Sequence, residues 1–188
     1  MRVIAGRYRS RPLRSMRGMD IRPTADRLRE TLFDVLTAGN PAALEGTVWL
    51  DLYAGTGAVG IEALSRGAAR VYFAEWSAGP AELVRLNLES LGIADGFEVL
   101  RTDALRAVRT LEGRGIFADY VFLDPPYRME EEYERTLNAL SHSPLLKPRS
   151  LVIAEHHKKF VPGETLGELC RYRRLVQGDA SLSFFRRV

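Results

Sequence analysis

The stretch Val48–Ala63, VWLDLYAGTGAVGIEA, places a short apolar run directly before a glycine-rich turn and the start of a helix. The apolar run suits a strand that is buried on both faces, and Asp51 lies near its end. Gly55, Gly57 and Gly60 follow at the spacing G-x-G-x-x-G. Glycines at a strand-to-helix turn let the backbone approach a ligand, and the helix N-terminus supplies free N–H groups. The stretch therefore predicts a pocket of the nucleotide-binding type.

The glycine spacing alone leaves the ligand open. It also fits a tight turn without a ligand, or a dinucleotide fold, in which an acidic residue follows about 20 residues later, as Glu75 does here. Asp51, however, would repel a pyrophosphate, whereas it suits the ammonium group of an amino acid. The tetrapeptide Asp124-Pro125-Pro126-Tyr127 is not required by dinucleotide chemistry. Together these features predict a cofactor, S-adenosylmethionine (SAM).

Length and composition set broad limits. The chain has 188 residues, of which 46% are hydrophobic and 27% charged, as in a globular domain with room for a small extension. It contains neither an apolar run of about 20 residues nor an apolar signal core, so we expect no membrane span and a cytoplasmic location. Cys170 is the single cysteine, and His142, His156 and His157 lack metal-ligand spacing, so no metal site is predicted.

Positive charge is concentrated at the N-terminus. Residues 1–30 hold nine arginines and three acidic residues, a net charge of +6, so the other 158 residues carry −3 of the total of +3. An arginine-rich composition would explain arginine in place of lysine, but it would not explain this clustering. A basic arm on a near-neutral body predicts a polyanionic partner. The arginines expected to contact nucleic acid here are Arg7, Arg9 and Arg11.

From residue 48 onward, strand-like and helix-like segments alternate. The expected strands are 48–52, 70–74, 97–101, 119–124 and 150–155, and the expected helices are 57–66, 78–91, 103–112 and 130–141. Such alternation predicts an α/β fold with a parallel sheet that binds ligands at the carboxyl ends of its strands. The segments 170–176 and 182–187 suit a closing antiparallel hairpin. Residues 1–13 read as a strand or hairpin, and a helix opens at Pro23.

Acidic residues follow several of the expected strands. Glu75 ends the second strand and could accept hydrogen bonds from the ribose hydroxyls of a nucleotide. Asp103 follows the third strand and could accept from an adenine amino group, cap the following helix, or do both. Glu155 ends the fifth strand, where it could touch the substrate, although a structural role is the interpretation preferred here.

The tetrapeptide Asp124–Tyr127 suits a planar amine. Its prolines stiffen the turn, which leaves the Asp124 carboxylate and the Pro125 carbonyl as acceptors beside the Tyr127 ring. Two acceptors and an aromatic face can hold the exocyclic NH₂ of a base. An arylamine is a poor nucleophile, so acceptors on its N–H groups would favour attack on the activated methyl of SAM. Asp124 is an acceptor in this interpretation, and the residues alone do not show whether it also acts as a base.

With these motifs the chain resembles the bacterial RsmD family, which methylates guanine N2 in 16S ribosomal RNA. The resemblance covers nearly the whole length and rests on MRVIAGRYRSRPL (1–13), RPTADRLRETLFDVL (22–36), DLYAGTGAVGIEALSRGA (51–68), DPPY (124–127) and QGDASLSFF (177–185). The second and third stretches are specific in combination, whereas DPPY is shared by amino-methyltransferases that act on adenine and glutamine.

The resemblance implies a class I SAM-dependent methyltransferase, with a Rossmann-like, mostly parallel seven-stranded sheet and a C-terminal antiparallel hairpin. Residues 1–40 would form an RNA-contacting extension, and residues 41–188 the methyltransferase domain. The cofactor contacts expected are Asp51, Tyr53, Ala54, Gly55, Thr56, Gly57, Glu75, Asp103 and Ala104; Asp124, Pro125, Pro126 and Tyr127 would hold the base; Arg22, Thr24 and Arg27 would lie beside it. The family commonly has an acidic residue at Ser77 and threonine at Ala180, which puts fine specificity in question more than activity.

The sequence therefore predicts a monomeric SAM-dependent enzyme that methylates guanine N2 in 16S ribosomal RNA, either naked or in an assembled particle. An adenine-N6 methyltransferase is the nearest alternative, because the same tetrapeptide can hold either amine. A glutamine methyltransferase leaves the basic arm unexplained. The presence of Asp51, Glu75 and Asp124 together disfavours a non-catalytic RNA-binding or assembly factor. Equilibrium binding of SAM against NAD would distinguish a nicotinamide-dependent oxidoreductase.

Overall fold

A computed structural model describes residues 1–15 and 23–188, with side chains described for 1–15 and 26–188. The helices are α1 (Pro23–Thr37), α2 (Ala58–Ser65), α3 (Ala78–Leu91), α4 (Ala104–Gly113) and α5 (Glu130–Ser141). The strands are β1 (Val48–Leu52), β2 (Arg70–Ala74), β3 (Phe97–Leu100), β4 (Ala118–Leu123), β5 (Leu146–His157), β6 (Thr165–Leu166), β7 (Leu169–Gln177) and β8 (Ala180–Arg187). None of the helices in these ranges has the length and hydrophobicity that a membrane crossing requires.

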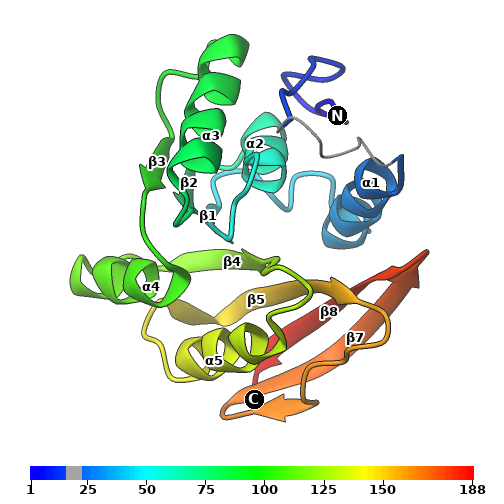
Figure 1. The fold of residues 1–188 in the computed structure, drawn as a ribbon, viewed down its shortest axis with the longest axis vertical. Helices are drawn as coiled ribbons and strands as arrows, with labels where there is room; N and C mark the ends of the chain where they lie inside the picture. The colour runs from blue at the N-terminus through cyan, green and yellow to red at the C-terminus, as the bar shows by residue number, and fades with distance from the viewer. Residues whose placement is uncertain (16–22) are drawn as a thin grey trace.

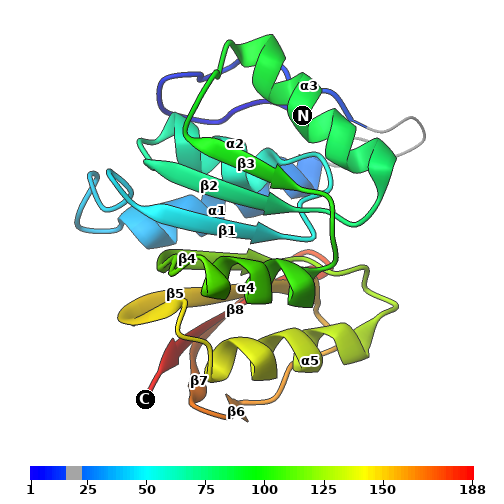
Figure 2. The same cartoon turned by 90° about the vertical axis from the view of Figure 1, so that its left-hand side faces the viewer.

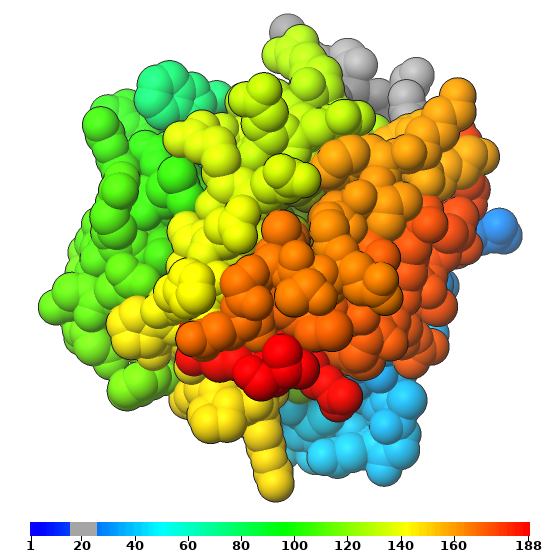
Figure 3. All heavy atoms as spheres, turned by 90° about the horizontal axis from the view of Figure 1, so that it is seen from below, coloured from blue at the N-terminus to red at the C-terminus, as the bar shows by residue number. Residues whose placement is uncertain are grey.

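The strands of the described residues form one sheet in the order β3-β2-β1-β4-β5-β8-β7-β6 (Figures 1 and 2). Strands β1 to β5 are parallel, and β8 runs antiparallel between β5 and β7. This confirms the predicted Rossmann-like sheet with its C-terminal hairpin. The sheet has one strand more than predicted, the two-residue β6, which is too short to show an alternating pattern. Figure 3 shows this edge of the molecule, with the segment from β5 to β7 in orange at the surface.

Side-chain alternation along the strands divides the core into two layers. In β1, Trp49 belongs to the core that α1, α2 and α3 cover, whereas Leu50 belongs to the core under α4 and α5. Figure 2 shows α4 and α5 in front of the sheet and α1 and α2 behind it. Because successive residues of a strand point to opposite faces, Asp51 shares the α2 face with Trp49. The central strands are thus buried on both sides, as their continuous apolar runs predict.

Gly60 brings α2 close to the sheet. A Cβ at this position would lie 2.3 Å from Cε1 of Phe73 on β2, so a larger residue would push the helix away. The third glycine of the motif therefore serves helix–strand packing. This packing sets the height of the helix N-terminus above the ends of the strands.

The first fifteen residues, called the arm below, fold back on the domain. Arg2 and Pro12 form an antiparallel bridge, and Val3 and Leu13 are buried in the α1–α3 core. This confirms the predicted hairpin-like arm, which lies beside α2 (Figure 1) and is hydrogen-bonded to Asn87 and Ser90 of α3. Through Val3 and Leu13 the arm shares its core with the rest of the chain.

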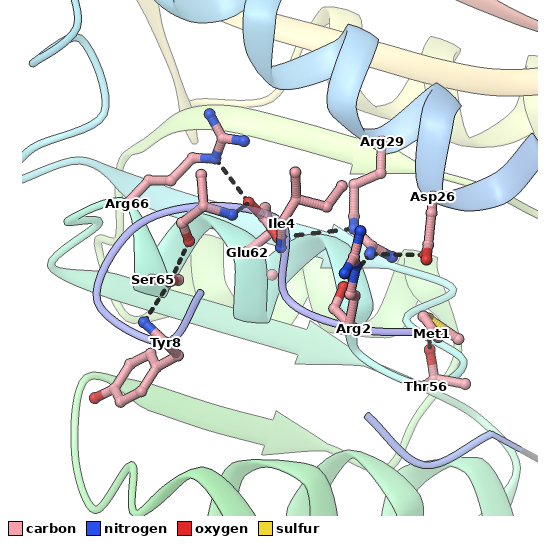
Figure 4. Close-up of polar contacts among 12 residues, drawn as sticks. Met1, Arg2, Ile4, Tyr8, Asp26, Arg29, Thr56, Glu62, Ser65 and Arg66 are labelled. Atoms are coloured by element: carbon pink, nitrogen blue, oxygen red, sulfur yellow. Dashed lines mark hydrogen bonds and ion pairs between the residues drawn. The ribbon is translucent and has the colours of Figure 1, made fainter. Parts of the chain in front are cut away.

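One buried acid anchors the arm. Glu62 on α2 is 0% exposed and accepts hydrogen bonds from the backbone N–H groups of Ile4 at 2.8 Å and Ala5 at 2.9 Å (Figure 4). Its carboxylate also pairs with Arg66 at 2.8 Å and lies 3.8 Å from Nε of Arg29. The charge is therefore neutralised where it is buried, which a carboxylate in a core requires.

Candidate active site

A cavity of about 1180 Å³ opens where the parallel strands end. The predicted residues that line it are Asp51, Tyr53, Ala54, Gly55, Thr56, Glu75, Asp103, Ala104, Asp124, Pro125, Pro126 and Tyr127. They come from positions far apart in the sequence, yet the parallel register brings them to one edge of the sheet. The cavity can hold a nucleoside-sized cofactor together with a base, since ligand pockets usually measure about 300–1000 Å³.

Gly57 is the one member of the predicted cofactor set that does not line the cavity. It is the N-cap of α2 with φ of 76°, a left-handed conformation that glycine adopts without strain. A Cβ there would lie 3.0 Å from Cγ1 of Val84, so it would point toward α3. The structure thus gives Gly57 a role in the turn and in packing.

Asp51 is the most deeply buried acid of the cavity wall, with 2% of its surface exposed. Its Oδ2 accepts a hydrogen bond from the N–H of Gly60, in the first turn of α2, at 2.9 Å. The pKa of Asp51 is raised to about 7, mainly by burial and to a smaller extent by the charge of Glu75, against the lowering effect of the Gly60 N–H. A cation bound beside Asp51 would favour the charged form.

Glu75 joins the glycine turn to the end of β2. Its two carboxylate oxygens accept from the N–H of Gly55 at 3.0 Å and from the N–H of Ser77 at 2.8 Å. Each oxygen has a further lone pair, so the carboxylate retains the capacity to accept from two hydroxyl groups. The predicted ribose contact is therefore compatible with the hydrogen bonds that fix this side chain.

Tyr53 has a left-handed backbone with φ of 63°, which is uncommon for a residue with a side chain. Its hydroxyl group lies 2.8 Å from Oγ1 of Thr136 and donates to Glu132 at 3.1 Å. These bonds tie the turn after β1 to α5 across the cavity. The strained conformation places the Tyr53 ring in the wall beside the site.

Asp103 caps α4, as one of its two predicted roles required. Its Oδ1 accepts from the N–H of Arg106 at 2.9 Å, and its Oδ2 lies 3.3 Å from the Arg106 guanidinium. Ala104 is buried directly behind it. Asp103 also lines the cavity, so its role as a helix cap is compatible with the predicted contact to an adenine amino group.

The tetrapeptide Asp124–Tyr127 directly follows β4. Asp124 is partly buried, and burial raises its pKa well above the usual value, with further contributions from the charges of Glu155 and Asp51. The Pro125 carbonyl accepts a hydrogen bond from the buried Tyr133 hydroxyl at 3.0 Å. One of its two lone pairs is therefore occupied, a feature the sequence did not indicate.

Glu155, for which a structural role was preferred, is a further acid of the cavity wall. It lines the same cavity, next to the tetrapeptide, and accepts a hydrogen bond from the Tyr127 hydroxyl at 3.4 Å. Burial raises the pKa of Glu155 to about 7, whereas Tyr127 and Arg29 lower it. An available signal was that Glu155 follows the apolar run of β5, as Asp124 follows that of β4.

The arm arginines differ in their contacts. Arg7 and Arg9 are exposed, and the N–H of Arg7 donates to the Ser65 carbonyl at the end of α2. Arg11 is exposed, but its guanidinium donates to the Ser90 carbonyl at 2.9 Å, which docks the arm on α3. Arg27 is exposed on α1, whereas Arg22 lies outside the described residues.

Thr24 lies in α1, and its side chain is outside the described part of the chain.

Asn87, buried on α3, links the arm to the glycine turn. Its side chain accepts from the N–H of Arg14 at 2.8 Å and donates to the Thr56 carbonyl at 2.9 Å. The basic arm therefore borders the cavity at its C-terminal end. In the described ranges, no group of three or more His, Cys, Asp or Glu side chains is arranged to hold a metal ion.

Comparison with known proteins gives consistent matches over the full length. The model of the family described as "Conserved hypothetical protein 95" matches residues 1–186. The chain is 32% identical to "Ribosomal RNA small subunit methyltransferase D" of Escherichia coli K12, over 96% of this chain and 93% of the relative. It is also 32% identical to "Putative rRNA methyltransferase YlbH" of Bacillus subtilis, over 100% and 99%. A solved structure, "Putative methyltransferase yhhF from Escherichia coli", superposes with a TM-score of 0.81 at 29% identity, over 100% of this chain and 97% of that one.

Proposed function

The chain belongs to the Conserved hypothetical protein 95 family, the RsmD family of ribosomal RNA methyltransferases, and we propose that it methylates the N2 amine of a guanine in small-subunit ribosomal RNA. The observation that carries this proposal is the meeting of Asp51, Glu75 and Asp124 in one cavity at the carboxyl ends of the strands. The first two suit a cationic cofactor, and the third suits an amine.

The cavity residues fit SAM. When bound, SAM supplies a methyl group already activated by a positively charged sulfur. Asp51 would hold the ammonium group, because a cation stabilises its buried carboxylate. Glu75 would accept from the ribose hydroxyls and Asp103 from the adenine amino group, while Tyr53 to Thr56 form the wall beside them.

The tetrapeptide would hold the target base. Asp124 and the remaining lone pair of the Pro125 carbonyl accept from the exocyclic amine, and the Tyr127 ring, 38% exposed, offers a face for stacking. These acceptors orient the nitrogen lone pair toward the methyl group. The methyl group would pass to the nitrogen while the sulfur keeps the electron pair of the broken S–C bond, and the ionised Asp124 carboxylate would take up the proton that the nitrogen releases. Positioning of this kind can contribute about 7–11 kcal/mol in favourable cases.

A paired or stacked base has to leave its stack to enter the cavity, at a cost of a few kcal/mol. Contacts with the RNA backbone would repay that cost. Arg7, Arg9 and Arg27 are exposed and free to reach phosphates, and residues 1–40 would supply most of these contacts. Arg7 lies at the far end of α2 from the cavity, about 12 Å for an eight-residue helix, which a folded RNA can span.

Transfer and binding can be separated in one experiment. The purified protein is incubated with SAM and either naked 16S RNA or small-subunit particles from a strain lacking the gene, and the modified nucleoside is identified. We expect N2-methylguanosine with at least one of the two substrates. Asp124→Ala should lower transfer at least a hundredfold while the calorimetric affinity for SAM stays within a few-fold. Turnover at the wild-type rate would exclude the role of Asp124, and methylation of adenine alone would exclude the guanine assignment.

A further inference from the structure

Two acids stand side by side in the part of the cavity that would hold the base. The parallel register of β4 and β5 pairs Leu123 with Ala154, so Asp124, directly after β4, comes beside Glu155 on β5. Paired strands lie about 4.8 Å apart. Asp124 and Glu155 therefore form an acidic pair in the wall of the same cavity.

The side chains of this pair share a face of the sheet. Phe122 and Ile153, two residues before them, both belong to the core that α1 covers. Residues two apart along a strand point to the same side, so both carboxylates point to that side. Arg29 of α1 also lines the cavity there, but within the described residues no basic side chain forms an ion pair with Glu155.

Glu155 is therefore a partly buried acid with spare acceptor capacity. Among the described residues, its carboxylate accepts from the Tyr127 hydroxyl at 3.4 Å, which is long for an O–H···O bond. A carboxylate offers about four acceptor sites. Burying a carboxylate is unfavourable unless donors surround it, so this spare capacity is consistent with a ligand that supplies further donors.

We propose that Glu155 accepts the N1–H of the target guanine while Asp124 accepts from its N2 amine, and that this pair selects guanine over adenine. The inference rests on the proposed function and concerns the same site. Guanine presents N1–H and the N2 amine as adjacent donors. Adenine presents its amine beside an N1 lone pair, which would face the Glu155 carboxylate. Buried acceptors left without a donor reject the wrong base strongly.

A purely structural role for Glu155 makes a different prediction. If Glu155 only positioned Tyr127, Glu155→Gln would preserve an acceptor for the Tyr127 hydroxyl and would leave base selection unchanged. If Glu155 recognises N1–H, the amide can also donate to an unprotonated N1. Base selection, rather than the overall rate, therefore distinguishes the two roles.

The base 2-aminopurine tests this directly, because it carries the same amine as guanine but has no hydrogen on N1. The substrates are small-subunit RNA, naked and reconstituted into particles, with guanine or 2-aminopurine at the modified position. We expect the wild-type protein to methylate guanine about ten- to a hundredfold faster. Glu155→Gln should bring the two rates within about threefold, whereas Glu164→Gln, a change at an exposed acid outside the cavity, should keep the wild-type ratio.

Different results would contradict the role of Glu155 and the proposed function. If the wild-type protein methylates 2-aminopurine as fast as guanine, or if Glu155→Gln retains the wild-type ratio, the role of Glu155 is wrong and the proposed function stands. If the wild-type protein methylates no guanine in either form of the RNA, the proposed function itself is wrong. The wild-type comparison needs no variant, so it decides the inference even if Glu155→Gln folds poorly.

Discussion

Asp51→Asn should stabilise the ligand-free protein, and by more at high pH than at low pH. The pKa of this acid rises from 3.8 to about 7 on folding, mainly because it is buried. The folded protein holds a proton that the unfolded chain has lost, so stability falls as the pH rises from about 4 to about 7. Each pH unit in that window costs about 1.4 kcal/mol. Asparagine has no charge to desolvate and retains an oxygen that can accept from Gly60.

The gain in the free energy of unfolding should therefore be about 1.5 kcal/mol at pH 5 and about 4 kcal/mol at pH 8. Urea unfolding of both proteins at the two pH values measures it. Asp95→Asn removes the same charge from an exposed turn and should show no such gain. Equal gains for Asp51→Asn at both pH values would show that the buried carboxylate carries no desolvation cost.

The same substitution should weaken SAM binding, because the carboxylate that opposes the ammonium group is lost. At pH 8, saturating SAM should raise the midpoint of thermal unfolding clearly in the wild-type protein and much less in Asp51→Asn. Stability and cofactor affinity would then change in opposite directions. An equal shift in both proteins would remove Asp51 from the cofactor site.

Replacing Arg7 and Arg9 with Ala should weaken RNA binding and reduce the slope of log K against log salt by about 0.7–0.9 for each lost phosphate contact. An unchanged slope would return these arginines to a structural role. Gly60→Ala should destabilise the protein by about 1–3 kcal/mol, because the new Cβ meets the Phe73 ring, and wild-type stability in urea would refute that packing. Glu62→Gln should cost about 3–5 kcal/mol, because it leaves buried arginine charge uncompensated. The arm should then become sensitive to proteolysis, and its persistence would show that other contacts hold it.

The fold could be predicted because its signals are local. The period of the apolar residues marked the strands and helices, and strict alternation of the two marked a parallel sheet. The glycine motif marked the turn after β1, but its spacing could not separate ligand contact from packing. Gly55 lines the cavity, whereas Gly57 and Gly60 face α3 and β2, a distinction that depends on neighbours far along the chain.

The parts of the site that the sequence did not reveal depend on register. Glu155 comes beside Asp124 only because β5 pairs with β4 at Leu123 and Ala154. The sequence showed that an acid lies at or near the end of several strands, but it could not show which acids would share a face. The same limit applies to the Pro125 carbonyl, whose bond to Tyr133 joins a turn to a helix.

The sequence predicted that the arm packs on the domain, but it did not reveal the polar side chains that hold the arm there. Alternating apolar and basic residues indicated that Val3 would pack on the body, and it does. The anchors are polar, however: Glu62 and Asn87 are both 0% exposed and bind the backbone of the arm. A carboxylate within the apolar helix sequence AVGIEALS was a signal for such a buried partner, since isolated charges are excluded from cores.

The central claim is that this cavity brings SAM and the N2 amine of a guanine in small-subunit ribosomal RNA together. Mass analysis of nucleosides from that RNA, in a strain lacking the gene, tests it most directly. We expect one N2-methylguanosine to be absent, to return with the wild-type gene, and to stay absent with Asp124→Ala. A full complement of N2-methylguanosine in the deleted strain, or the loss of a methylated adenine in its place, would contradict the account.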